Sequence, residues 1–246
     1  MLTPAMSVDV FPLLLLLGRP ASGKSEIIDY LGRQTDDERR RRFHLGSLAV
    51  RDDFPLLWSW LEEDALLERM GQPRLHSSTD GYFLQRHSWD VLVQMLCQSH
   101  DNALADDPGR GAGRSFVLEF SRGREHGGYR RALDNLTDAI LRRAAILYVR
   151  VSFQESLRKN RRRFNPERPH SILEHGLSDE KMDRLYRDDD WDEVCAAPRR
   201  SVEVRGITVP AMSLENEDDV TTPRGPALGQ RLEECLGALW EDRRRG

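Results

Sequence analysis

Several features that would point to other classes of protein are scarce in this sequence. It has three cysteines, Cys97, Cys195 and Cys235, with no CxxC pair and no Cys/His cluster, so a zinc site is not expected and reduced thiols are. The apolar run from Phe11 to Leu17 is far shorter than the roughly 20 residues that cross a bilayer, and no basic stretch precedes it. We therefore expect a cytoplasmic protein with no membrane role.

Neither positive nor negative charge dominates the chain. Among 246 residues 37 are basic and 41 acidic, and the formal net charge is −4, so nucleic-acid binding is not expected. The block Arg39 to Arg42 follows acidic residues and is typical of a solvated helix end. With 39% hydrophobic residues the composition is that of a globular chain, whose length fits a single α/β domain, 1–246, with insertions.

Hydrophobic patterning gives the expected fold class. Apolar runs at 11–17, 115–120 and 144–151 do not alternate with polar residues, which is typical of strands covered on both faces, and 207–214 is a further candidate. Helical periodicity is expected at 24–34, 54–70, 88–103, 133–143 and 227–243. This alternation predicts an α/β fold with a central parallel sheet of about five strands and helices on both faces.

One motif predicts a specific chemistry. Residues 18–25 read GRPASGKS and match GxxxxGK[ST], directly after an expected buried strand and at the start of an expected helix. Small residues let backbone N–H groups surround a phosphate, Lys24 adds a charge for the β- and γ-phosphates, and Ser25 offers a hydroxyl to Mg²⁺. The residues expected to bind ATP, or a related NTP, are Gly18, Ala21, Ser22, Gly23, Lys24 and Ser25.

A carboxylate follows near the end of the strand expected at 115–120. Glu119 should lie at the carboxyl edge of the sheet, where ligands bind in folds of this class. There it could hold Mg²⁺ or accept a proton from an attacking hydroxyl, and Arg122 could bind an acceptor oxyanion or the transferred phosphate. A solvated glutamate at the end of a strand is the structural alternative.

A second basic cluster, Arg158 to Arg163, follows the strand expected at 144–151. Arg158 and Arg162 are four residues apart, so they lie on one face of a helix and could act together in catalysis by clamping a transferring phosphoryl group. A solvated basic face is the alternative.

In this order of elements the sequence resembles the P-loop nucleoside and nucleotide kinases, adenylate kinase among them. The resemblance implies a three-layer P-loop NTPase fold with a helical substrate-binding region at 54–103 and an arginine-bearing, lid-like insertion at 158–192. It departs from adenylate kinase in the spacing of Glu119 and Arg122, which is three rather than four.

Within the region 54–103, carboxylates and aromatics come close together in the sequence. Asp80, Tyr82 and Trp89 have the residue types that hydrogen-bond a hydroxyl and stack on a ring, so we expect them to contact a substrate. Aromatic side chains of this kind are also common in protein cores, which is the alternative.

These features favour a phosphotransferase, a kinase that uses ATP and Mg²⁺ on a small-molecule acceptor such as a nucleoside or nucleotide. The alternative is a P-loop ATPase that acts as a switch, or a nucleotide sensor, without such an acceptor. The sequence has no NKxD-type guanine motif, and Glu119 is not followed by a second acid, so the alternative ranks second.

Overall fold

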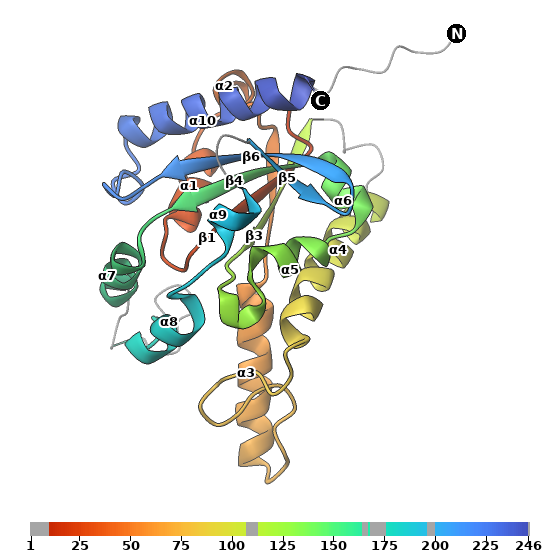
Figure 1. Cartoon of the computed structure of the whole chain (residues 1–246), viewed down its shortest axis with the longest axis vertical. Coiled ribbons are helices and arrows are strands. Elements are labelled where there is room, and N and C mark those ends of the chain that lie inside the picture. The colour runs from red at the N-terminus through yellow and green to blue at the C-terminus, as the bar shows by residue number, and fades with distance from the viewer. Residues whose placement is uncertain (1–9, 107–112, 164–166, 168–175, 196–199, 246) are drawn as a thin grey trace.

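The structure is a computed structural model that describes residues 10–106, 113–163, 167, 176–195 and 200–245. Its centre is a six-stranded sheet in the order β2-β3-β1-β4-β6-β5 (Figure 1). All neighbouring strands are parallel except β5, which runs antiparallel to β6 at one edge. The strands are β1 (Leu13–Gly18), β2 (Ser47–Asp52), β3 (Arg114–Phe120), β4 (Ala144–Arg150), β5 (Ser201–Val204) and β6 (Ile207–Glu215).

The four predicted strands are confirmed, and two further strands complete the sheet. Every residue of β1 is buried, as its unbroken apolar sequence requires for a strand covered on both faces. The two that were not predicted, β2 and β5, are edge strands: β2 is half-exposed, and β5 is four residues long. Edge strands need few apolar residues, which explains why the expected count of about five strands was too low.

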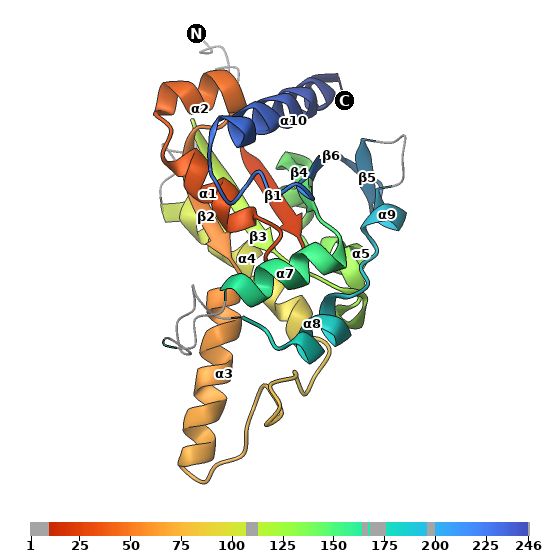
Figure 2. The ribbon, with the colours of Figure 1, turned by 90° about the vertical axis from the view of Figure 1, so that its left-hand side faces the viewer.

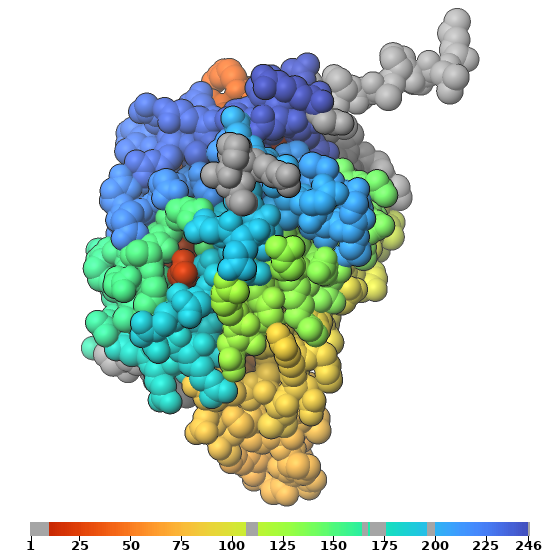
Figure 3. All heavy atoms as spheres, in the orientation of Figure 1, coloured from red at the N-terminus to blue at the C-terminus, as the bar shows by residue number. Residues whose placement is uncertain are grey.

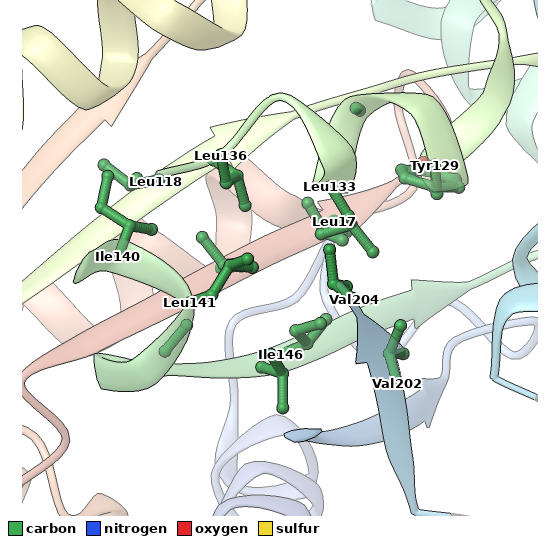
Figure 4. Close-up of a cluster of buried hydrophobic side chains, with 14 of the residues drawn as sticks. Leu17, Leu118, Tyr129, Leu133, Leu136, Ile140, Leu141, Ile146, Val202 and Val204 are labelled. Atoms are coloured by element: carbon green, nitrogen blue, oxygen red, sulfur yellow. The ribbon is translucent and has the colours of Figure 1, made fainter. Parts of the chain in front are cut away.

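Helices cover both faces of the sheet, which makes three layers. On one face α1 (Lys24–Gly32) and α10 (Pro226–Arg245) pack their leucines and isoleucines on the alternate side chains Leu14 and Leu16 of β1. On the other face α4 (Ser88–Asp106), α5 (Gly128–Asp134) and α6 (Asp138–Arg143) pack on a cluster that includes Leu17, Leu118 and Ile146 (Figure 4). The helix predicted at 133–143 is thus two helices.

The remaining helices extend from these layers or lie at the edge of the sheet where the parallel strands end. Figures 1 and 2 show α3 projecting from the body as an arm, with the chain returning along it to α4. None of the helices in the described ranges has both the length and the hydropathy of a bilayer-crossing segment. The helices outside the two layers named above are α2 (Asp36–Phe43), α3 (Phe54–Arg69), α7 (Phe153–Arg163), α8 (Asp179–Tyr186), α9 (Trp191–Val194) and the 3₁₀ helix η1 (Arg124–His126).

The region predicted as a lid, 158–192, is only partly described. Residues 164–166 and 168–175 lie outside the described ranges. Its later part packs on the body of the protein, because Met182, Tyr186 and Trp191 are buried and Trp191 stacks on Tyr148 of β4. Large apolar and aromatic side chains, which stand singly among charged residues in the sequence, anchor α8 and α9. Single residues of this kind give no apolar run, so the sequence analysis did not predict these helices.

Candidate phosphate-binding and carboxylate site

The loop between β1 and α1 requires glycine at two positions. Gly18 has φ of 151°, and a Cβ there would lie 2.7 Å from both Ser22 Oγ and Val149 O. Gly23 has φ of 111°, and a Cβ there would lie 2.4 Å from Thr221 Oγ1. The glycines therefore let the loop pack closely on the protein. Ala21 also has positive φ, 55°, a backbone strain of the kind found at ligand sites.

Neighbouring segments hold the loop from outside through its carbonyl groups. Ser156 Oγ on α7 donates to Pro20 O at 2.7 Å, and Asn216 Nδ2, just after β6, donates to Ser22 O at 2.7 Å. In the view of Figure 3, a small red area from the N-terminal part of the described chain shows between α7 and the α8–α9 segment. Side chains of α7 and of the segment after β6 thereby fix two carbonyl groups of the loop.

Arg19, at a variable position of the motif, fastens the loop to the chain after α8. Its guanidinium pairs with Asp189 at 2.8 Å and donates to the carbonyl oxygens of Tyr186, Arg187 and Val151, each at 3.2 Å. Asp189 in turn accepts from Tyr148 Oη at 2.9 Å. The phosphate loop, β4 and the segment after α8 are thereby joined in one network, which sequence analysis did not find.

Lys24 is buried at the first position of α1 and points back over the loop. Its Nζ donates to Gly18 O at 3.2 Å, Arg19 O at 3.0 Å and Ser121 Oγ at 2.8 Å, and lies 3.9 Å from Glu119 Oε1. Burial lowers the pKa of Lys24, and the nearby carboxylates oppose that shift. The lysine and the acid, 95 residues apart in sequence, are brought together as predicted.

Two carboxylates that sequence analysis missed lie beside Glu119. Asp52 ends β2 and is in register with Glu119 on β3, and Asp53 follows it. Asp52 Oδ1 accepts the N–H of Phe54 at 3.0 Å, which fixes its orientation at the start of α3. The edge strand β2 was not predicted, so nothing in the pattern marked these residues as the end of a strand beside β3.

The shared burial of these acids shifts their titration. Burial raises the pKa of Glu119 to about 7, with Lys24 opposing the shift and the two aspartates adding to it. Burial likewise raises the pKa of Asp52 to about 6; the Phe54 N–H opposes this, and Asp53 adds to it. Carboxyl groups that bind protons near neutral pH are suited to proton transfer.

Arg122 lies at the site but is already paired. It is 2% exposed, lies 2.7 Å from Asp53 Oδ2, and donates to the carbonyl oxygens of Ser121 and Trp89. Its guanidinium also lies over the rings of Trp89 and Phe120, 5.1 and 5.2 Å from their centroids. Arg122 lines the cavity, as its predicted role requires, but it is paired with Asp53, so binding of an acceptor oxyanion by Arg122 stays a prediction.

The predicted arginine pair on α7 faces away from the loop. Arg158 pairs with Glu155 at 2.7 Å and with Asp219 at 3.3 Å, and Arg162 is exposed. The face of α7 toward the loop instead carries Ser156, Asn160 and Arg163, which are spaced at i, i+4 and i+7. Arg158 and Arg162 thus do not line the cavity at the loop, because four-residue spacing identifies a face and not its direction. Their role as a phosphoryl clamp stays a prediction.

The loop between β1 and α1 and the carboxylates line one cavity. It measures about 110 Å³, and its walls include Lys24, Ser25, Asp52, Glu119 and Arg163. The exposed hydroxyl of Ser25 and the two acids suit Mg²⁺, which binds one or two carboxylates together with phosphate oxygens and water. In the described ranges no group of three or more His, Cys, Asp and Glu side chains forms a metal site by itself.

A second cavity of about 280 Å³ adjoins the first. It lies between three elements: α3, the segment that leads from α3 to α4, and α8. The walls of the two cavities share Phe54, Leu57, Trp89, Leu177 and Tyr186. Trp89, one of the three predicted substrate residues, thus lines both cavities.

The other two predicted substrate residues line neither cavity. Asp80 is exposed, and the ring of Tyr82 lies under Lys181 Nζ and the Arg184 guanidinium, 5.5 and 4.1 Å from its centroid. Gly81 and Phe83, between and beside them, line the second cavity instead. Residues 79–81 form a turn, in which Gly81 has φ of 73°, and this turn leaves Asp80 and Tyr82 outside both cavity walls. Their contact with a substrate stays a prediction.

Comparisons with known proteins identify no family. No protein-family model and no curated protein matches the chain. One solved structure, described as the crystal structure of APE1195, aligns over 91% of this chain and 96% of its own, with 12% identity and a TM-score of 0.35. A similarity at this level supports no statement about function.

Proposed function

We propose that the chain is an ATP-dependent phosphotransferase that acts on a small-molecule acceptor. The observation that carries the proposal is the junction of two cavities: the phosphate loop and the carboxylates line one, and an apolar cavity opens beside it through shared walls. A hydrolase needs room only for water near the γ-phosphate. A second, separate cavity next to the carboxylates supports an acceptor molecule.

In the proposed three-layer P-loop NTPase fold, the residues divide the chemistry among them. The loop N–H groups and the start of α1 bind the phosphates of ATP, and Lys24 transfers its hydrogen bonds from carbonyl oxygens to phosphate oxygens. Ser25 and Glu119 would hold Mg²⁺, which would offset negative charge on the phosphates. Asp52, oriented by the N–H of Phe54, takes the proton of the acceptor hydroxyl.

The test is ADP formation measured with Mg-ATP and a panel of acceptors, for the wild type and two variants. Stimulation by one class of acceptor is expected, and Asp52→Asn should lower the stimulated rate by about 10²-fold, as the loss of a general base does. Asp37→Asn, at an exposed position of α2, is the matched control and should leave the rate unchanged. ADP formation that no acceptor stimulates would favour the ATPase alternative.

A further inference from the structure

The second cavity is apolar over most of its wall. Its surface is formed by side chains such as Phe54, Leu57, Leu61, Phe83, Trp89 and Tyr186. At about 280 Å³ it is near the lower end of the range of ligand pockets, about 300 to 1,000 Å³, so it suits a compact molecule of one or two rings. Aromatic side chains on several sides favour a flat, ring-bearing occupant.

Few charged side chains line this cavity, and each of them already contacts another side chain. Among the described residues they are Glu62 and Lys181. Glu62 accepts the indole N–H of Trp58 at 2.9 Å, and Lys181 lies over the ring of Tyr82. A nucleobase would bury its ring nitrogens and exocyclic groups here with little to pair them, and each unpaired polar group costs about 1–3 kcal/mol.

The charges of the first cavity favour a hydroxyl as the reacting group of the acceptor. Asp52, Asp53 and Glu119 line that cavity together with Lys24, Arg122 and Arg163, and Asp53 pairs with Arg122 at 2.7 Å. An acceptor phosphate or carboxylate would compete with the phosphates of ATP for Lys24 and Arg163. An uncharged hydroxyl would instead donate a hydrogen bond to a carboxylate.

We propose that the acceptor is an uncharged alcohol with a compact, ring-bearing apolar body, seated between α3, the 81–89 segment and α8, with its hydroxyl at the junction. This inference rests on the proposed phosphotransfer and narrows its substrate class away from nucleosides and nucleotides. The acceptor oxygen forms a bond to the γ-phosphorus while the bond to the β–γ bridging oxygen breaks with its electron pair left on ADP. The hydroxyl proton passes to a carboxylate and then to water, which gives a phosphate monoester and ADP.

Binding to the full chain tests the substrate class independently of turnover. Calorimetry would compare indole-3-ethanol, 2-phenylethanol and cyclohexylmethanol with indole-3-acetate, adenosine and AMP, and would measure Mg-AMP-PNP separately. We expect the best alcohol to bind at least tenfold more tightly than the acid, the nucleoside and the nucleotide, and to stimulate ADP formation from ATP.

Two tryptophan substitutions on α3 localise the binding. Ala65 lines the cavity and is exposed enough for Ala65→Trp to fill it, whereas Leu66, 49% exposed, lies outside it. Ala65→Trp should weaken alcohol binding at least tenfold, Leu66→Trp less than twofold, and both should bind Mg-AMP-PNP like the wild type.

The outcomes separate this inference from the proposed function. If no alcohol binds, or if Ala65→Trp binds it as the wild type does, the substrate class is wrong, even where AMP or adenosine stimulates ADP formation. If alcohols bind as expected but Mg-AMP-PNP does not bind, the phosphotransfer proposal is wrong and the apolar site remains.

Discussion

Asp64 provides the sharpest test of how the arm is held together. It is fully buried on α3, and its two carboxylate oxygens accept hydrogen bonds from four donor groups of the chain that follows the helix. Oδ1 accepts the N–H groups of Leu75 and His76 at 2.6 and 3.1 Å, and Oδ2 accepts the N–H and Oγ–H of Ser77, both at 2.6 Å. Asp64→Asn keeps the size of the side chain and removes one of these acceptors.

The cost of the substitution follows from the donors it leaves behind. The amide oxygen of asparagine can serve one pair of donors, but its NH₂ group then faces the other pair. Losing two hydrogen bonds to a charged group, at about 1.5–3 kcal/mol each, should destabilise the closed segment by about 3 kcal/mol or more. Since about 1.4 kcal/mol is a factor of ten, hydrogen exchange at residues 75–77 should accelerate by about 10²-fold.

The same segment leads to Gly81 and Phe83 in the wall of the apolar cavity, so Asp64→Asn should weaken alcohol binding while Mg-AMP-PNP binding stays intact. Asp80→Asn, an exposed change in the same segment, is the matched control.

Burial alone would raise the pKa of Asp64, but the hydrogen bonds that it accepts outweigh burial and lower the pKa to about 2. Its contribution is therefore present above pH 4 and is lost as pH falls toward 2. Unchanged exchange in Asp64→Asn at pH 7 would refute the reasoning.

Three further predictions concern the phosphate loop and the acids. Lys24→Met should lower ATP turnover at least 10²-fold in a steady-state assay, and an active variant would argue against the loop's role. Arg19→Ala should loosen the chain at Tyr186, and calorimetry should then show weaker alcohol binding. Alcohol binding with wild-type affinity in this variant would contradict the prediction. Because burial raises the pKa of Glu119 and Asp52, the ligand-free fold should lose stability as pH rises from about 4 to 7, and Glu119→Gln should show a smaller loss in thermal unfolding.

The sequence predicts the centre of this molecule well because burial there leaves a direct pattern. Leu13 to Leu17 can only be a strand covered on both sides, and the motif that follows needs the turn the structure shows. Glu119 was located by the same reasoning, since a carboxylate near the end of a buried strand lies at the carboxyl edge of the sheet.

Prediction failed where the role of a side chain depends on a partner distant in sequence. The pairing of Arg122 depends on Asp53, which lies at the end of an edge strand too polar to be recognised from periodicity. Arg158 pairs with Asp219, 61 residues further along the chain, in addition to Glu155 on its own helix. Sequence spacing gives the positions of such charges on an element, but the sheet order and the direction of α7 decide which charges meet.

Arg19 shows the same limit within the motif itself. In GxxxxGK[ST] its position tolerates any residue, because a ligand meets the backbone of the loop there and not the side chain. In this chain the side chain turns outward and donates to Tyr186 O, while the ring of Tyr186 lines both cavities. Movement of the loop on binding phosphates would therefore be transmitted to the wall of the apolar cavity, and the two ligands should bind with coupled affinities.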